Sequence, residues 1–241
     1  MRIRELRKKI GVLLSGCGYI DGSEIHESTL TLLALDKQNA IAVPISINKD
    51  QFHTVNHHTQ NEQPHQIRNM LEESARIARS PVKSCRHITG DDIDGLIIPG
   101  GFGVAKNFSN FAQKGADTEI NPDIKQLIID LHKQKKPQGF ICIAPILAAA
   151  VIGRGQLTIG TDKETRLELE RLGATHIECT ADNIVMDLKE RFVSTPAYML
   201  NSRLTEIQIG IEKCVKKVLE WTITKPTLQC DYERNISKTH A

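Results

Sequence analysis

The sequence predicts an α/β protein built on a mostly parallel sheet that helices cover on both faces. Segments with strand patterning alternate with segments of helical patterning along the chain, which is typical of βαβ units. The expected strands are short and almost wholly apolar, as parallel strands buried on both faces usually are. Three of them end directly in turns that carry glycine or cysteine, and open parallel sheets bind ligands at these carboxyl ends.

The first half of the chain is expected to supply three strands and two helices. The apolar run over 9–14 predicts a buried strand, which Ser15-Gly16-Cys17-Gly18 ends. Ser23 is a favourable N-cap, and the apolar residues behind it recur at helical spacing, so a helix is expected over 23–36. The polar segment 49–66, rich in His, Asn and Gln, is expected to form a loop. The other elements of this half are strands at 40–45 and 94–99 and a helix at 67–79 that Pro81 ends.

The second half continues the alternation of strands and helices. Pro122 suits the first turn of a helix, and four apolar positions behind it form one stripe, so a helix is expected over 122–134. A strand at 138–143 leads to a short apolar helix that begins at Pro145. We then expect a strand near Leu157, a helix at 164–172, strands at 184–186 and 192–195 joined by a hairpin-like turn, and a helix at 200–221.

The pattern contains no internal repeat and no linker, so the whole chain, 1–241, is expected to form a single domain. Its core would span about 9–221, and the polar tail over 222–241 is expected to be loosely ordered. A chain of 241 residues can bury a proper core without the help of disulfides or metals.

Composition excludes several classes of function. A formal net charge of +2 without a large basic cluster argues against a nucleic-acid partner. The chain lacks an apolar run long enough to span a membrane. Its six cysteines form no CxxC pair, which indicates free thiols in a reducing compartment, so we expect a cytoplasmic protein, with an organelle as the alternative. The basic residues between Arg2 and Lys9 are either a solvated lead-in to the first strand or a remnant of a targeting segment.

Neither a metal nor a cofactor is expected. The glycines after the strand at 94–99 lack the GKS or GKT ending of a P-loop, and Asp21 stands where a dinucleotide fingerprint needs its third glycine. The spacing of the histidines in the polar segment fits no structural zinc pattern; these are His53, His57, His58 and His65.

Cys142 is the strongest candidate for a reactive group. A nucleophilic side chain stands at the end of the strand at 138–143, and Pro145 starts a helix within three residues, so the chain must turn sharply. The arrangement is that of a nucleophile elbow, without the flanking glycines of the hydrolase version. A helix N-terminus stabilises a thiolate, so we expect a lowered thiol pKa. The alternative is a small buried residue, which is the usual fate of cysteine.

A second strand end supplies candidate backbone donors. Pro99 is followed by Gly100, Gly101, Phe102 and Gly103, whose backbone can come close to a ligand. Together with the amide of Ile143, these amides could hold an oxyanion beside the thiol, and Asn107 could line the rim. A plain tight turn is the alternative.

The third strand end leads to two acidic residues. Glu24 and Glu27 are one helical turn apart at the start of the helix over 23–36, so they share a face and one of them could point at the elbow. Acidic residues also suit a helix N-terminus because of the helix dipole. Cys17, on the same turn, is either a second pocket thiol or a core residue.

Several motifs in this order resemble the ElbB family, also called sigma cross-reacting or enhancing lycopene biosynthesis proteins. The resemblance covers roughly 9–219 and rests on Gly22-Ser23-Glu24-Ile25-His26-Glu27, the segment from Pro99 to Asn107, Ser109-Asn110-Phe111-Ala112, Cys142-Ile143-Ala144-Pro145, Gly160-Thr161-Asp162 and Ser194-Thr195-Pro196-Ala197-Tyr198-Met199. It implies a class I glutamine amidotransferase-like domain of the superfamily of PfpI-type proteases and Parkinson-associated deglycases. The implied fold is a flavodoxin-like three-layer sandwich, and the implied assembly is a homodimer.

The resemblance also assigns roles. Cys142 matches the elbow cysteine, Glu27 the glutamate that hydrogen-bonds it, with Glu24 as the near alternative, and Gly101 the oxyanion position. The histidine that follows the cysteine in the proteases is Ile143 here, and 157–162 lacks the histidine of the deglycase branch. A true glutamine amidotransferase or protease is therefore not expected. The nearest later histidine, His176, is expected to lie at the surface or at a strand end.

The implied activity is that of a cofactor-independent glyoxalase, which converts glyoxal to glycolate through the Cys142 thiol. The alternative is a non-enzymatic redox-sensing or interaction protein, because an elbow cysteine beside a carboxylic acid suits reversible oxidation. Only the family name links this alternative to isoprenoid biosynthesis.

Overall fold

A computed structural model describes residues 7–223, and its centre is one seven-stranded sheet. The strand order is β10-β11-β7-β6-β1-β2-β5, and every pair is parallel except β10 with β11. The strands are β1 (Lys9–Leu13), β2 (Ile41–Ser46), β5 (Lys83–Ser84), β6 (Gly95–Ile98), β7 (Gln138–Ile141), β10 (Val185–Asp187) and β11 (Phe192–Thr195). This arrangement confirms the predicted α/β fold with a mostly parallel central sheet.

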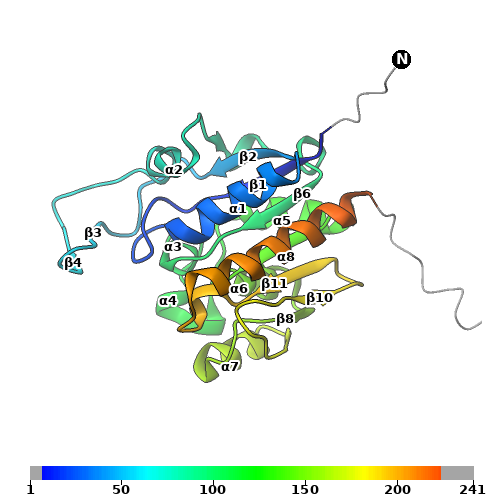
Figure 1. Cartoon of the computed structure of the whole chain (residues 1–241). Coiled ribbons are helices and arrows are strands. Elements are labelled where there is room, and N and C mark those ends of the chain that lie inside the picture. The colour runs from blue at the N-terminus through cyan, green and yellow to red at the C-terminus, as the bar shows by residue number, and fades with distance from the viewer. Residues whose placement is uncertain (1–6, 224–241) are drawn as a thin grey trace, which may run out of the picture.

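Helices cover the sheet on both faces and make three layers. In Figure 1, α1 (Ile25–Lys37) and α8 (Leu204–Ile223) lie in front of the strands and α5 (Pro122–Lys133) lies behind them. Alternate residues of β1 point to opposite faces of the sheet. Val12 packs with the helices α1 and α8, and Leu13 packs with the opposite layer. This alternation explains why the strand is apolar along its whole length. The other helices are α2 (Met70–Ala78), α3 (Phe102–Lys106), α4 (Phe111–Lys114), α6 (Pro145–Ile152) and α7 (Lys163–Arg171).

Three features differ from the expected elements. The polar segment contains a small hairpin, β3 (Val55–Asn56) with β4 (Asn61–Glu62), which projects from the body of the molecule (Figure 1). The strand expected near Leu157, β8 (Gln156–Leu157), pairs with β9 (Thr175–His176) in a sheet of its own. The helix expected from Ser23 is capped by Glu24, because the Glu24 carboxylate accepts a hydrogen bond from the Glu27 amide at 2.6 Å.

Five cysteines of the described part are free, in agreement with the expectation of free thiols: Cys17, Cys85, Cys142, Cys179 and Cys214. Within residues 7–223, every helix is too short or too polar to cross a bilayer. Arg2 and Arg4 of the basic N-terminal cluster, and nearly all of the polar tail, from residue 224 on, lie outside the described residues.

Candidate functional site

Cys142 lies at a sharp turn between β7 and α6. Its φ is +62°, in the left-handed region, which costs a non-glycine residue roughly 1–2 kcal/mol. The turn is held from both sides, because the Cys142 amide donates to the Thr195 carbonyl at 3.0 Å and the Ala144 amide donates to Ile141 at 3.0 Å. Backbone strain of this kind occurs at functional sites when the surrounding structure enforces it. The chain therefore makes the expected sharp turn between strand and helix at Cys142, which is 7% exposed.

Glu27 is the carboxyl group that meets this thiol. It is fully buried in the first turn of α1. Its carboxyl lies beside the thiol, because a Cβ at Gly100 would lie 2.8 Å from Glu27 Oε2 and 2.9 Å from Cys142 Sγ. One carboxyl oxygen, Oε2, accepts from the Gly100 amide at 2.8 Å, and the other accepts from the Tyr198 amide at 3.3 Å. Glu24 points instead at the end of its own helix, where it acts as the cap. The structure thus brings Glu27 to the thiol and gives Glu24 a different position.

Burial determines the protonation of this pair. It raises the pKa of Glu27 to about 8, with a further contribution from the negative charge of Glu24. Glu27 is therefore mostly a neutral carboxylic acid at neutral pH. Burial, followed by the charge of Glu27, also raises the pKa of the Cys142 thiol, while the amides of Gly101 and Ile143 act in the opposite direction. The expectation of a lowered thiol pKa is wrong, because desolvation outweighs the helix N-terminus at this depth.

The glycine segment after β6 approaches the thiol closely. A Cβ at Gly100 would lie 2.4 Å from the Cys142 Cβ and 2.9 Å from its Sγ. Gly101 has φ +97°, and a Cβ there would lie 2.4 Å from the Gly22 carbonyl oxygen. These positions admit only glycine without a shift of the backbone or of the thiol. The amides of Gly101 and Ile143, both expected as oxyanion donors, face the Cys142 sulfur.

The structure gives the other predicted pocket residues contacts within the surrounding loops. Phe102 begins α3, is 51% exposed and donates its amide to the Tyr19 carbonyl at 2.7 Å. The Gly103 amide donates to the Gly22 carbonyl at 2.9 Å. The Asn107 side chain donates to the carbonyls of Ser15 and Asp21 and accepts from the Phe52 amide. Asn107 therefore connects its own loop to the loops of Ser15 and Phe52. These hydrogen bonds use its side-chain amide, which was expected at the pocket rim.

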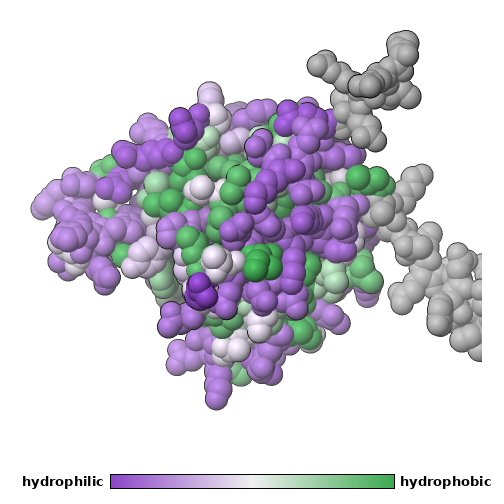
Figure 2. Space-filling view, in the orientation of Figure 1, coloured by the Kyte–Doolittle hydropathy of each residue, from purple (hydrophilic) through white to green (hydrophobic). Residues whose placement is uncertain are grey.

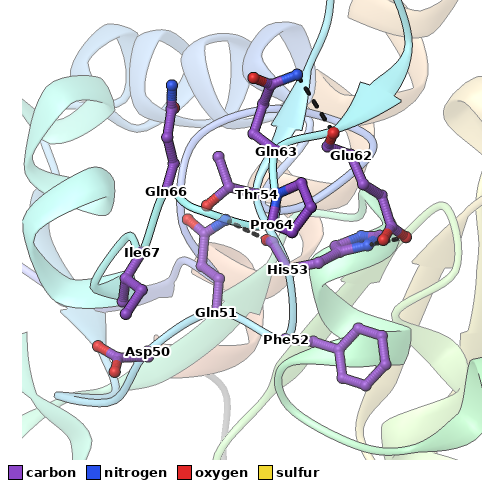
Figure 3. A pocket seen from close by; sticks show the side chains of 10 residues that line it. All are labelled: Asp50, Gln51, Phe52, His53, Thr54, Glu62, Gln63, Pro64, Gln66 and Ile67. Carbon is purple, nitrogen blue, oxygen red and sulfur yellow. Dashed lines mark hydrogen bonds and ion pairs between the residues drawn. The ribbon is translucent and has the colours of Figure 1, made fainter.

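The polar segment forms a cavity of about 330 Å³ beside α3 (Figure 3). His53 lines it and bonds Glu62 at 2.7 Å, while its other ring nitrogen lies 3.2 Å from Lys106 Nζ. Lys106 in turn lies over the Phe102 ring, 4.9 Å from its centroid. Among residues 7–223, no group of three or more His, Cys, Asp or Glu side chains is arranged to hold a metal ion.

Within residues 7–223, the groups that act on the Cys142 thiol are Glu27 and the amides of Gly101 and Ile143, and none of them is a histidine. His176 was expected at the surface or at a strand end. It is the last residue of β9, and it is buried. Two groups that the sequence did not single out lie beside Glu27 instead. His26 precedes it in α1, and its Nδ1 is 2.7 Å from the hydroxyl oxygen of Tyr198. Both residues stand within the family motifs, but 172 positions separate them, so only the fold reveals their contact.

The chain has curated relatives along most of its length. No family model matches it. The chain is 37% identical to the mitochondrial ES1 protein homolog of Rattus norvegicus over 225 residues, which make up 90% of this chain and 85% of the relative. It is 36% identical to the mitochondrial glutamine amidotransferase-like class 1 domain-containing protein 3 of Homo sapiens, over 89% of this chain and 83% of the relative.

Solved structures show the same fold. The crystal structure of an isoprenoid biosynthesis protein with an amidotransferase-like domain from Ehrlichia chaffeensis is 35% identical, with a TM-score of 0.82 over 88% of this chain and 99% of that one. DJ-1 of Schizosaccharomyces pombe has a TM-score of 0.53 at 17% identity, over 97% of this chain and 98% of that one. This second likeness concerns the fold alone.

The comparisons also correct one expectation and establish the family. The expected cytoplasmic location is contradicted, because the relatives from rat, human and Danio rerio are all mitochondrial proteins by name. The identity to the rat and human proteins extends over most of each chain. The chain therefore belongs to the ES1 family of glutamine amidotransferase-like class 1 domain proteins.

Proposed function

We propose that this protein is a cofactor-independent glyoxalase that converts glyoxal to glycolate through a covalent adduct on Cys142. The observation that supports it is the position of the buried Glu27 carboxyl group beside the Cys142 thiol, with the Gly101 and Ile143 amides at the sulfur. A thiol beside a group that exchanges protons near neutral pH suits addition to an aldehyde. The resemblance to ElbB proteins supplies the substrate.

The reaction begins from the form in which Glu27 and Cys142 share one proton. The sulfur attacks one aldehyde carbon, the π electrons of the C=O bond move to oxygen, and the amides of Gly101 and Ile143 hold the developing oxyanion. The shared proton passes to that oxygen and leaves a hemithioacetal beside a Glu27 carboxylate. Glu27 then removes the proton from the substituted carbon and returns it to the neighbouring carbon.

This transfer is an internal redox step that needs no external oxidant. The substituted carbon becomes a thioester carbonyl, and the neighbouring aldehyde becomes a primary alcohol. Water then adds to the thioester carbon, and the C–S bond breaks with its electron pair on sulfur. Glycolate and one proton leave for solvent, and Cys142 and Glu27 share a single proton again.

Glycolate formation from glyoxal by the purified protein tests the proposal. Cys142→Ser and Glu27→Gln should each lower kcat/KM by at least about 100-fold, since general acid–base groups contribute about 10²–10⁴-fold. Cys214→Ser is the matched control, because Cys214 is also buried but lies in α8. Activity in Cys142→Ser equal to that of the unmodified protein would overturn the proposal.

A redox-sensing or interaction role is the second candidate, and the observation that favours it is the same carboxylic acid beside the thiol. The Ehrlichia chaffeensis relative, which is named an isoprenoid biosynthesis protein, suggests the process it would serve. Mild peroxide followed by mass spectrometry distinguishes the two roles. Preferential oxidation of Cys142 in a protein without glyoxalase activity would favour the sensor, whereas uniform oxidation of all cysteines would exclude it.

We also propose a homodimer formed through the helices of one face. Over α1 and α8, hydrophobic residues reach the surface among hydrophilic ones (Figure 2). The exposed apolar residues of these two helices include Ile25, Leu33, Leu204 and Ile209. Light scattering on the purified protein gives its mass in solution. A charged substitution at Leu33 should shift a dimer toward the monomer, and a monomeric unmodified protein would contradict the proposal.

A further inference from the structure

We propose that His26 and Tyr198 form the proton relay that serves the substrate oxygens at the Cys142 site, in place of the superfamily histidine. This inference rests on the proposed glyoxalase function and deepens it. The relay consists of the Tyr198 hydroxyl and His26 Nδ1, whose heavy atoms are 2.7 Å apart. Tyr198 would act directly on the substrate, and His26 would position it and exchange protons with solvent.

The chemistry requires a second proton carrier besides Glu27. When Glu27 removes the proton from the substituted carbon, the oxygen of the neighbouring aldehyde becomes an enediolate and needs a proton. When Glu27 returns its proton to the neighbouring carbon, the first oxygen loses its own proton and becomes the thioester carbonyl. One proton must therefore reach one oxygen, and another must leave the other, while Glu27 is engaged with carbon. The net change at the relay is zero.

The backbone fixes the Tyr198 side of this relay. Tyr198 follows the carboxyl end of β11, the strand beside β7, and its amide donates to Glu27 Oε1 at 3.3 Å. The residue before it, Ala197, is fully buried and has φ +43°, a strained value for alanine. The main chain at Tyr198 is thus held against the carboxyl group beside the thiol, while its hydroxyl meets His26.

The His26 side connects the same point to water. His26 directly precedes Glu27 in α1, and it is exposed, whereas Glu27 is fully buried. Tyr198 is 38% exposed, so the pair lies between solvent and the buried carboxyl. Burial, together with the charges of Glu24 and Glu27, raises the pKa of the Tyr198 hydroxyl, which keeps it a proton donor. The imidazole can replace the proton that the hydroxyl gives up.

Steady-state kinetics with glyoxal test the relay through Tyr198→Phe and His26→Ala. Tyr198→Phe keeps the ring and the main-chain bond to Glu27, so it removes only the hydroxyl. We expect kcat to fall by about 10²-fold or more in both variants, with KM changed far less. Added imidazole should restore part of the rate in His26→Ala and none in Tyr198→Phe. The matched controls are Tyr19→Phe and His58→Ala, since both residues are exposed and outside the relay.

A measurement that does not depend on turnover separates a relay from a structural role. The rate at which iodoacetamide alkylates Cys142 should stay within about twofold of the unmodified protein in both variants, because the relay serves the substrate and not the thiol. The inference is overturned if kcat remains within threefold in Tyr198→Phe, or if alkylation falls together with activity. An inactive unmodified protein would reject the proposed function itself, whereas an active protein with active variants would reject the relay alone.

Discussion

Two buried cysteines of this protein have the same side chain and different surroundings. Cys214 is fully buried in α8, and burial raises its pKa to about 12. Cys142 is 7% exposed, and its pKa is also raised by burial. Of the two, only Cys142 also has a backbone in the left-handed region, a carboxyl group beside it and two backbone amides at its sulfur. Burial is thus common to both thiols, and the hydrogen-bonding neighbours distinguish the candidate reactive group from a core residue.

Each cysteine packs against a glycine, and substitution of these glycines should have the largest effect. Gly100→Ala would place a Cβ 2.4 Å from the Cys142 Cβ. Displacement of the thiol should lower kcat/KM for glyoxal by about 10²-fold or more, because small misplacements of reacting groups are costly. Gly139→Ala would place a Cβ 3.1 Å from the Cys214 sulfur. It should cost about 1–3 kcal/mol of stability by overpacking and leave kcat unchanged.

Kinetics and urea denaturation on these two variants check the contrast. Loss of activity in folded Gly139→Ala, or full activity in Gly100→Ala, would remove the distinction between the two cysteines.

The pH dependence of stability sharpens the same comparison, because only Cys142 has a titrating carboxyl partner. The pKa of Glu27 is about 8 in the folded protein against an ordinary 4.5. Between these pH values the folded protein keeps a proton that the unfolded chain has released. The free energy of unfolding should therefore fall as the pH rises from about 4.5 to about 8. Below this window Glu27 is protonated in both states and imposes no cost.

Glu27→Gln removes this titration and should flatten the decline. Urea midpoints of the two proteins, measured at several pH values across the window, give the difference. Parallel curves would mean that Glu27 titrates normally, so that the thiol lacks a neutral acid beside it.

The smallest effect is expected for Cys214→Ala. It removes one buried sulfur atom that packs against the glycine at 139 and should cost about 1 kcal/mol. Glyoxalase activity should remain within twofold of the unmodified protein. A larger loss of activity would mean that α8 helps to hold the site.

The sequence predicted much of the local geometry of the candidate site, because its parts lie in short local patterns. A cysteine placed between an apolar strand and Pro145 must lie in a sharp turn. Consecutive glycines after β6 indicate that the backbone there comes close to a neighbouring group. The choice between Glu24 and Glu27 needed coordinates, because a carboxylate at the start of a helix can serve equally as a cap. The direction of the thiol pKa shift also needed them, since depth of burial decides it.

The features that the sequence did not predict share a physical cause. They depend on contacts between distant segments, and such contacts leave no pattern in the local sequence. His26 and Tyr198 meet across 172 positions. The strands β8 and β9 have two residues each, too few for any periodicity to show that they form a separate sheet. Short strands of this kind take their conformation from the packing around them.

The edges of the central sheet limit how copies of this protein can associate. One edge strand, β5, has only two residues, and the other, β10, has three. Beside β10, the Gln156 amide of β8 bonds the Asp187 carboxylate at 2.8 Å and occupies that edge. Long unpaired edges are the templates on which foreign strands add and amyloid grows. The two edge strands themselves are short, so each offers few free backbone groups to a cross-β assembly.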